Sequence, residues 1–441
     1  MIISRLNLLI WLPVYIMLLG CRQYSMDEPN GLAVIDVVNN LGKYQAIPVC
    51  EFVIEFEYIP LETGNDCLIG EGDINLIITS THIFVQGGTY CYAFSRAGRF
   101  ISKIGSFGQG PGEYTNLINM SIDEITQSLY LETFRTLLEY SWDGKFHRAI
   151  QKPPTPTGYL VQSFFVRDSF FISHDPNHYG NAMYNFQLFN ESGQVFKSFD
   201  NPVRFNPAHP GNVLTNSAMK PFRMAERIYV KELWNDTLYY LDAQNELVPQ
   251  FVFDLGKYAL NKEKRTVPMS SGDDVVMNLF DGVIRIPAHQ QPMVGTPNHI
   301  FFSLLVVDAS TFNISFPEQL KRKMAIPAES QFLRFVDGCR PLGIYDIVNQ
   351  KTRLLNTDRI TRMSGLINDL DGGLSFWPKY YTSDNKLIDI WQAYEMKELL
   401  TEEYFAAHEI KDIQAHQKLK ELLKNLDEYD NPVVVIAKLK K

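Results

Sequence analysis

A nine-residue unit recurs along this chain of 441 residues: an apolar strand, a polar turn containing Gly or Asn, and a second apolar strand. The turn residues Gly98, Gly144, Gly193 and Asn245 follow one another at intervals of 46, 49 and 52 residues. Such a period is typical of a β-propeller, in which each blade is a sheet of four antiparallel strands. Because one blade cannot bury both of its faces, the repeat predicts blades stacked in a ring.

The repeat also predicts how many blades there are and how the ring closes. A fifth copy of the unit lies at 343–351, and the irregular, proline-containing stretch 260–323 before it indicates one blade with long loops. A last blade would use 367–377, 386–393 and 431–439, which supply only three strands. We expect 51–61 to provide the fourth strand. The prediction is an all-β, six-bladed propeller at 46–441, closed by an N-terminal strand.

One segment of the predicted last blade has a different period. Between residues 393 and 429, apolar residues recur at helical spacing among Lys and Glu. The pattern predicts one long or two short amphipathic helices inserted into the last blade. Their apolar face either docks a partner or packs on the propeller, and we favour packing.

The first 20 residues resemble an export signal. Arg5 precedes an apolar run that Pro13 interrupts and that is short for a membrane span, so we interpret residues 1–20 as a signal peptide. The run ends in Leu18-Leu19-Gly20-Cys21, which resembles the bacterial lipobox; the alternative is an ordinary signal peptide with a chance cysteine. The resemblance implies lipidation of Cys21, a lipidated tether over 21–45 and membrane attachment through acyl chains.

The residue after the lipobox cysteine indicates the destination. Arg22 rather than Asp at this position favours the outer membrane, by resemblance to the sorting rule of enteric bacteria. The chain would then be a bacterial outer-membrane lipoprotein facing either the periplasm or the cell surface.

The charge balance and the cysteine spacing argue against a nucleic-acid-binding protein and against a zinc protein. The chain has 41 Lys and Arg against 50 Asp and Glu, so a nucleic-acid partner is not expected. No CxxC pair or zinc-like spacing occurs. The remaining cysteines lie in apolar or strand-like surroundings, where we favour buried free thiols over disulfides. They are Cys50, Cys67, Cys91 and Cys339.

Two stretches carry a family resemblance. Residues 100–105, Phe-Ile-Ser-Lys-Ile-Gly, are followed at 108–114 by Gly-Gln-Gly-Pro-Gly-Glu-Tyr, and together they resemble the six-bladed β-propeller lipoproteins of Bacteroides-type bacteria, relatives of NHL-repeat propellers. Residues 58–63 and 367–373 resemble the same family. The resemblance implies the fold and carries no general activity.

The glycine-rich stretch 108–114 is a candidate ligand site. Its backbone could approach a ligand, with Glu113 as an acid or base and Tyr114 beside it. The alternative, which we favour, is a turn that connects two blades.

A second candidate is the sequence His174-Asp175-Pro176-Asn177-His178. Imidazole is a common metal ligand, so His174, Asp175 and His178 form a weak candidate metal site. Pro176 excludes a regular helix here, and a polar loop after a strand explains the pattern better.

The third candidate is the acidic segment after Ile367, with Asn368, Asp369 and Asp371 before two glycines. It resembles part of a calcium loop, but Tyr380 stands where the closing Glu should be, so Ca²⁺ is the alternative to the expectation of no cofactor. If Ile367 begins an innermost strand, these residues lie at the mouth of the central channel. Local turn hydrogen bonding is the alternative.

We therefore carry two functional hypotheses. The first is a monomeric, non-enzymatic, lipid-anchored propeller that binds a glycan, a peptide or an envelope protein. The second is a hydrolase or lyase, with polysaccharides as one substrate class, that uses carboxylates at the channel mouth.

Overall fold

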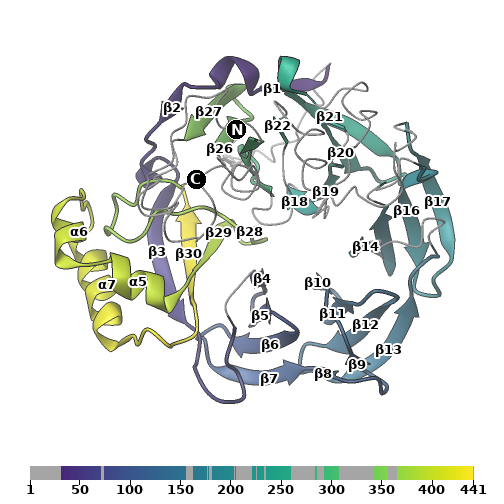
Figure 1. Ribbon diagram of the computed structural model, residues 1–441, viewed down its shortest axis with the longest axis horizontal. Coiled ribbons are helices and arrows are strands. Elements are labelled where there is room, and N and C mark those ends of the chain that lie inside the picture. Colours follow the sequence, from purple (N-terminus) through teal and green to yellow (C-terminus); the bar gives the residue numbers. More distant parts are fainter. Residues whose placement is uncertain are drawn as a thin grey trace, which may run out of the picture.

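The computed structural model describes residues 31–70, 74–154, 162–175, 177, 181–202, 204, 221–224, 226–232, 235–259, 284–285, 293–306, 341–355 and 365–440. Six of the sheets that these residues form have four or five strands, and they stand as blades around a central axis (Figure 1). The prediction of an all-β, six-bladed propeller is confirmed.

Blades 1 to 3 are antiparallel meanders, in which each strand pairs with its neighbour in the sequence. Blade 1 contains β4 (Ile74–Ile78), β5 (His82–Gly87), β6 (Tyr90–Ser95) and β7 (Phe100–Ile104). Blade 2 contains β10 (Asn119–Asp123), β11 (Ser128–Glu132), β12 (Thr136–Ser141) and β13 (Phe146–Gln151). Blade 3 contains β14 (Gln162–Arg167), β15 (Phe170–His174), β16 (Tyr184–Asn190) and β17 (Val195–Asp200).

Blades 4 and 5 each gain a fifth strand from the N-terminal segment. Blade 4 contains β18 (Phe222–Met224), β19 (Arg227–Val230), β20 (Thr237–Leu241) and β21 (Leu247–Asp254). Blade 5 contains β23 (Val294–Gly295), β24 (His299–Ser303), β26 (Leu342–Asp346) and β27 (Lys351–Leu355). β1 (Ala33–Asp36) pairs in parallel with β21, and β2 (Tyr44–Gln45) pairs in parallel with β27. Both strands lie within 21–45, the range interpreted above as a tether.

Short elements connect these blades. The 3₁₀ helices are η1 (Val38–Asn40), η2 (Val49–Glu51) and η3 (Gly256–Tyr258). Two small sheets also occur, one of β8 (Ser106–Phe107) with β9 (Glu113–Tyr114) and one of β22 (Ile284–Arg285) with β25 (Leu305–Val306).

Blade 6 joins the two ends of the chain. β28 (Tyr380–Tyr381), β29 (Lys386–Trp391) and β30 (Val433–Leu439) come from the C-terminal region, and β3 (Val53–Pro60) pairs with β30 as the outermost strand. The predicted closure by 51–61 is therefore confirmed.

The prediction that residues 367–377 supply the innermost strand of blade 6 is wrong. β28 occupies that position, whereas Leu366 and Phe376 form an isolated bridge and Ile367 bridges to Pro48. Leu366, Leu374 and Phe376 are buried in the cluster between blades 5 and 6. Their burial in an irregular segment explains a pattern that resembled a strand.

The recurring nine-residue unit is the hairpin between the third and fourth strands of a blade. Gly98, Gly144, Gly193 and Asn245 have φ angles of +76°, +89°, +77° and +62°. Gly adopts this left-handed conformation at little cost and Asn tolerates it. In each of the four hairpins one residue of the fourth strand is skipped in the pairing, which is a β-bulge. The repeat is therefore a left-handed turn followed by a β-bulge in the fourth strand.

The core is divided among the blade interfaces. Six clusters of buried apolar side chains each bridge two neighbouring blades, and together they complete the circle. Between blades 2 and 3, for example, the ring of Tyr130 stacks on Phe165 and meets the edge of Phe171. Aromatic side chains therefore fill the spaces between sheets, as flat rings on pleated surfaces do.

The meander gives the ring two distinct ends. Because the strands of a blade alternate in direction, the connection from second to third strand lies at the same end as the connection to the next blade. We call this the loop end and the opposite one the turn end. The helical insertion, between β29 and β30, connects a second strand to a third and so begins at the loop end.

Three helices form this insertion: α5 (Ala393–Leu399), α6 (Glu402–Ala406) and α7 (Ile413–Asn425), beside β3 and β30 in Figure 1. The expectation of one or two helices is wrong because Thr401 and Asp412 cap new helix starts. Met396, Phe405 and Leu419 are buried in the same cluster as blade 6. The favoured packing of the apolar face on the propeller is confirmed.

Cys50, Cys67 and Cys91 are free thiols, the last two buried. Cys339 and Cys21 lie outside the described residues.

Candidate functional site

The glycine-rich stretch at 108–114 folds back on itself between blades 1 and 2. The Glu113 carboxylate accepts hydrogen bonds from the Gly110 N–H at 2.8 Å and from the Ser106 hydroxyl at 3.4 Å. Tyr114 is buried and donates its hydroxyl to the Ile104 carbonyl. Both candidate residues therefore brace the connection between blades, in line with the structural alternative.

The acidic segment lies beneath the helical insertion, so its expected position at the channel mouth is wrong. Asp369 accepts the Cys50 N–H at 3.0 Å and pairs with Lys411 at 2.6 Å. Burial alone would raise the pKa of Asp369, but hydrogen bonds from Cys50 and Lys411 hold it below its usual value.

The neighbouring side chains are engaged in the same way. Asp371 accepts the hydroxyl of Tyr58 at 2.8 Å and the N–H of Gly373 at 3.0 Å. Asn368 accepts the N–H groups of Leu370 and Asp371 through its Oδ1. These hydrogen bonds join the N-terminal region, β3 and the insertion to one another. They also mean that the carboxylates of the segment already have protein donors.

His174 and Asp175 lie at the end of β15 on the loop end. Both are buried, and the His174 ring packs against Phe186 with centroids 5.1 Å apart. His178 lies outside the described residues. The part of the chain that is described holds no group of three His, Cys, Asp or Glu side chains placed to bind a metal ion.

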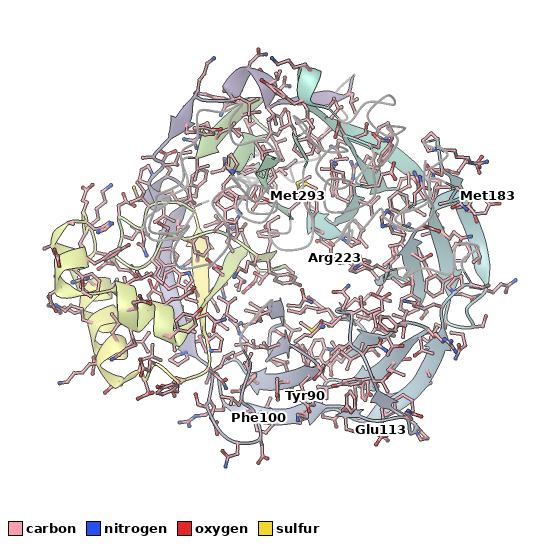
Figure 2. All side chains as sticks on the ribbon, viewed as in Figure 1. Tyr90, Phe100, Glu113, Met183, Arg223 and Met293 are labelled. Carbon is pink, nitrogen blue, oxygen red and sulfur yellow. The ribbon has the colours of Figure 1, made fainter. Side chains whose placement is uncertain are left out.

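The candidates named from the sequence are thus not brought together. Glu113 lies between blades 1 and 2, Asp369 and Asp371 lie between blade 6 and the insertion, and His174 lies in blade 3. One residue that the sequence did not single out, Arg223, approaches the central channel instead. Figure 2 shows Arg223, an exposed residue of the innermost strand β18, pointing toward the middle of the ring.

The groups that interact with Arg223 come from different blades. Arg223 donates from Nη2 to the Val166 carbonyl of blade 3 at 2.5 Å. Burial raises the pKa of Tyr380, in blade 6, to about 12; Glu124 of blade 2 adds to this and Arg223 opposes it. Charges from blades 2 and 4 therefore act on one tyrosine of blade 6.

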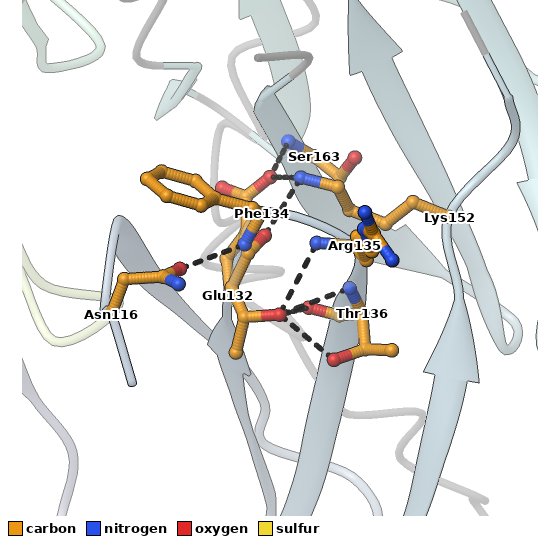
Figure 3. A network of polar contacts seen from close by, with 8 residues as sticks. Asn116, Glu132, Phe134, Arg135, Thr136, Lys152 and Ser163 are labelled. Carbon is orange, nitrogen blue, oxygen red and sulfur yellow. Dashed lines mark hydrogen bonds and ion pairs between the residues drawn. The ribbon is translucent and has the colours of Figure 1, made fainter. Parts of the chain in front are cut away.

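A larger polar network joins blades 2 and 3 at the loop end (Figure 3). Glu132, at the end of β11, pairs with Lys152 at 2.8 Å, with side chains only 1% and 4% exposed. The same oxygen, Oε1, accepts the backbone N–H of Ser163, on the innermost strand of blade 3, at 2.6 Å. A buried pair of this kind requires full hydrogen bonding to offset desolvation.

The second carboxylate oxygen of Glu132 differs from the first in its hydrogen bonding. Within the described part of the chain, Glu132 Oε2 and Ser163 Oγ have no hydrogen-bond partner. Burial raises the pKa of Glu132 to about 7, although Lys152 and the Ser163 N–H both lower it. At 1% exposure this carboxyl is a structural joint between blades rather than a group that a substrate reaches.

The network supports a turn at residues 133–136, between β11 and β12. The Phe134 N–H donates to Asn116 Oδ1 at 2.9 Å, and the N–H groups of Arg135 and Thr136 donate to Thr133 Oγ1 at 3.3 and 3.0 Å. Lys152 donates from Nζ to the Thr133 carbonyl and from its backbone N–H to the Arg135 carbonyl. The turn is therefore rigidly held.

Two side chains of this turn face solvent. Phe134 is 50% exposed, and Arg135 is also exposed. Aromatic and Arg side chains on a preorganised element are the combination that dominates many recognition surfaces. The sequence signal for this site is slight: Glu132 interrupts an apolar strand, and Phe134 stands in a turn where polar residues are usual.

The family profile of DUF4934, described as a domain of unknown function, matches residues 32–438. The chain belongs to this family. The match covers all six blades and the helical insertion, so the DUF4934 domain is the whole propeller. No curated protein matches the sequence.

Solved structures resemble the DUF4934 chain at low sequence identity. A Bacteroides fragilis protein classed as exported has 14% identity and a TM-score of 0.61, over 93% of this chain and 100% of that one. A DUF4221 family member from Bacteroides vulgatus has 10% identity and a TM-score of 0.48, over 88% and 97% of the two chains. The first likeness shows a shared fold.

A virginiamycin B lyase from Staphylococcus aureus also matches, with 6% identity and a TM-score of 0.36, over 70% of this chain and 90% of that one. Among the described residues of the DUF4934 protein, no helix is long and apolar enough to cross a membrane.

Proposed function

We propose that the protein is an outer-membrane lipoprotein, anchored through Cys21, whose propeller binds a glycan, peptide or envelope protein at the loop end without catalysis. The turn at 133–136 carries this proposal. It presents Phe134 and Arg135 to solvent on a backbone held by Asn116, Thr133 and Lys152. A rigid backbone reduces the entropy lost on binding.

The enzymatic alternative has less support. Glycoside chemistry by two carboxyl groups needs them roughly 5 to 10 Å apart with access to substrate. Glu113 lies in a different part of the ring from Asp369 and Asp371, and all three are bound to protein donors. The Glu132 carboxyl is buried under its own turn.

Binding is tested with the purified chain lacking its first 21 residues. Arrays of glycans and of peptides are probed with wild-type protein and with Phe134→Ala. The control is Phe196→Ala, because Phe196 is 48% exposed but lies near the start of β17, at the turn end. We expect one ligand class to bind wild type and the control and to be lost with Phe134→Ala. Equal binding by all three proteins would place the site elsewhere.

Anchoring is tested separately by fractionation. Cys21→Ala should release the protein from the membrane fraction, because acyl chains supply the attachment. Wild-type fractionation of the variant would refute the anchor.

A further inference from the structure

Resting on the proposed function, we infer that the turn at 133–136 binds an acidic glycan, with Phe134 stacked on a sugar ring and Arg135 paired with a carboxylate of the chain. The inference concerns the ligand class and follows from what the turn leaves available for contact.

The first step is the state of the backbone. The N–H groups of Phe134, Arg135 and Thr136 all have acceptors within the protein. The carbonyls of Thr133 and Arg135 accept from Lys152. An extended peptide is recognised largely through main-chain hydrogen bonds. This turn has few such groups to offer, so its ligand must be bound through side chains.

The second step is the exposed aromatic ring. Phe134 is 50% exposed although the turn that holds it is fixed. The face of an aromatic ring is electron-rich and attracts polarised C–H groups. A pyranose presents several such C–H groups on one face, which makes a sugar ring a suitable partner for Phe134.

The third step is charge. Lys152 is paired with Glu132 beneath the turn. Arg135 is exposed, and within the described part of the chain no carboxylate lies within ion-pair distance of it. The planar guanidinium binds carboxylates through two parallel hydrogen bonds. The turn therefore carries one uncompensated positive charge and one exposed aromatic ring, on opposite sides of its backbone in Figure 3, so the stacked sugar and the paired carboxylate belong to different residues of an acidic oligosaccharide.

The experiment compares two probes that differ only in charge. An oligosaccharide of galacturonic acid and its fully methyl-esterified form are titrated into wild type, Phe134→Ala and Arg135→Gln. Phe196→Ala and Arg99→Gln serve as controls, because Arg99 is an exposed arginine in the hairpin turn of blade 1, at the turn end. Urea midpoints equal to wild type establish that the variants are folded.

We expect wild type and both controls to bind the acid at least about tenfold more tightly than the ester. Arg135→Gln should abolish this difference and Phe134→Ala should weaken both probes. If Arg135→Gln keeps the preference for the acid, the charge assignment is overturned. If wild type binds both probes equally, the ligand is not acidic, while the proposed binding function stands. Binding of peptides but no glycan overturns the glycan assignment alone, and binding of neither class counts against the proposed function itself.

Discussion

The side-chain Oδ1 of Asn431 accepts a hydrogen bond from the backbone N–H of Ile69 at 2.8 Å, across the joint between the last and first blades. Its Nδ2 donates to the carbonyls of Glu62 and Cys67, at 2.7 Å each. Asn431 is 1% exposed, so water cannot replace these bonds.

Asn431→Asp should therefore be strongly destabilising although it keeps the shape of the side chain. A carboxylate would face two carbonyl oxygens in a buried place. We expect a loss of about 2–4 kcal/mol in the free energy of unfolding, measured with urea. Asn425→Ala, in the exposed end of α7, should change it by less than about 0.5 kcal/mol. Equal effects would show that the joint does not depend on this amide.

The buried pair of Glu132 and Lys152 gives a second prediction. Lys152→Ala leaves the Glu132 carboxyl buried without its cation and removes the side-chain hydrogen bond to the Thr133 carbonyl of the turn at 133–136. The expected loss is about 3–5 kcal/mol. The matched change is Lys438→Ala, whose pair with Glu55 is 3.8 Å long and exposed on both sides, and it should cost less than about 1 kcal/mol.

The pH dependence of stability follows from Glu132. Its pKa is raised from 4.5 to about 7 by burial, so between these values the folded protein holds a proton that the unfolded chain releases. This contribution is complete below the unfolded pKa and is lost as pH rises through about 7. Urea midpoints measured across this range should fall with rising pH. Glu132→Gln should flatten that slope, and an unchanged slope would assign it to another group.

The helical insertion gives a prediction with its control on the same helix. Leu419 of α7 is fully buried against blade 6, whereas Ile413 of α7 is 57% exposed. Leu419→Ala should cost about 2–5 kcal/mol, because it leaves a cavity in the shared core. Ile413→Ala should be nearly neutral. A neutral Leu419→Ala would mean that the insertion does not unfold together with the ring.

Two glycines of blade 1 separate backbone strain from crowding. Gly98 and Gly88 both have left-handed backbones, with φ of +76° and +58°. A Cβ at Gly88 meets open space, but one at Gly98 meets the Pro60 carbonyl of β3. Gly88→Ala should cost about 1–2 kcal/mol of conformational strain. Gly98→Ala should cost clearly more in the same denaturation assay, because β3 or the hairpin must move.

The architecture was predictable because it rests on local chemistry that repeats. The turn residues Gly98, Gly144, Gly193 and Asn245 need left-handed backbones, so their spacing reports one hairpin per blade. The first strand of blade 6 was not predictable. β28 has only two residues, too few for an alternating pattern, while the apolar residues around Asp369 are buried without forming a strand.

The candidate site was missed for a different reason. The turn at 133–136 is defined by Asn116, Lys152 and Ser163, which lie 16 or more residues away from it in the sequence. The sequence of the turn itself does not indicate these partners. Only the folded ring shows that a buried ion pair lies under an exposed phenylalanine.

The pairing of β3 with β30 sets the order in which the molecule can be completed. Val53 lies opposite Leu439 and Pro60 lies opposite Val433, so the outermost strand of the last blade is synthesised before any blade of the ring. During synthesis β3 has no partner strand in its sheet until β30 is made, and β30 follows the residues of the other five blades. Closure joins residues separated by almost the whole chain, and such long-range pairing is slow. A ribosome that stops before β30 leaves both edges of the ring open, with their hydrogen-bonding groups free to pair with other chains.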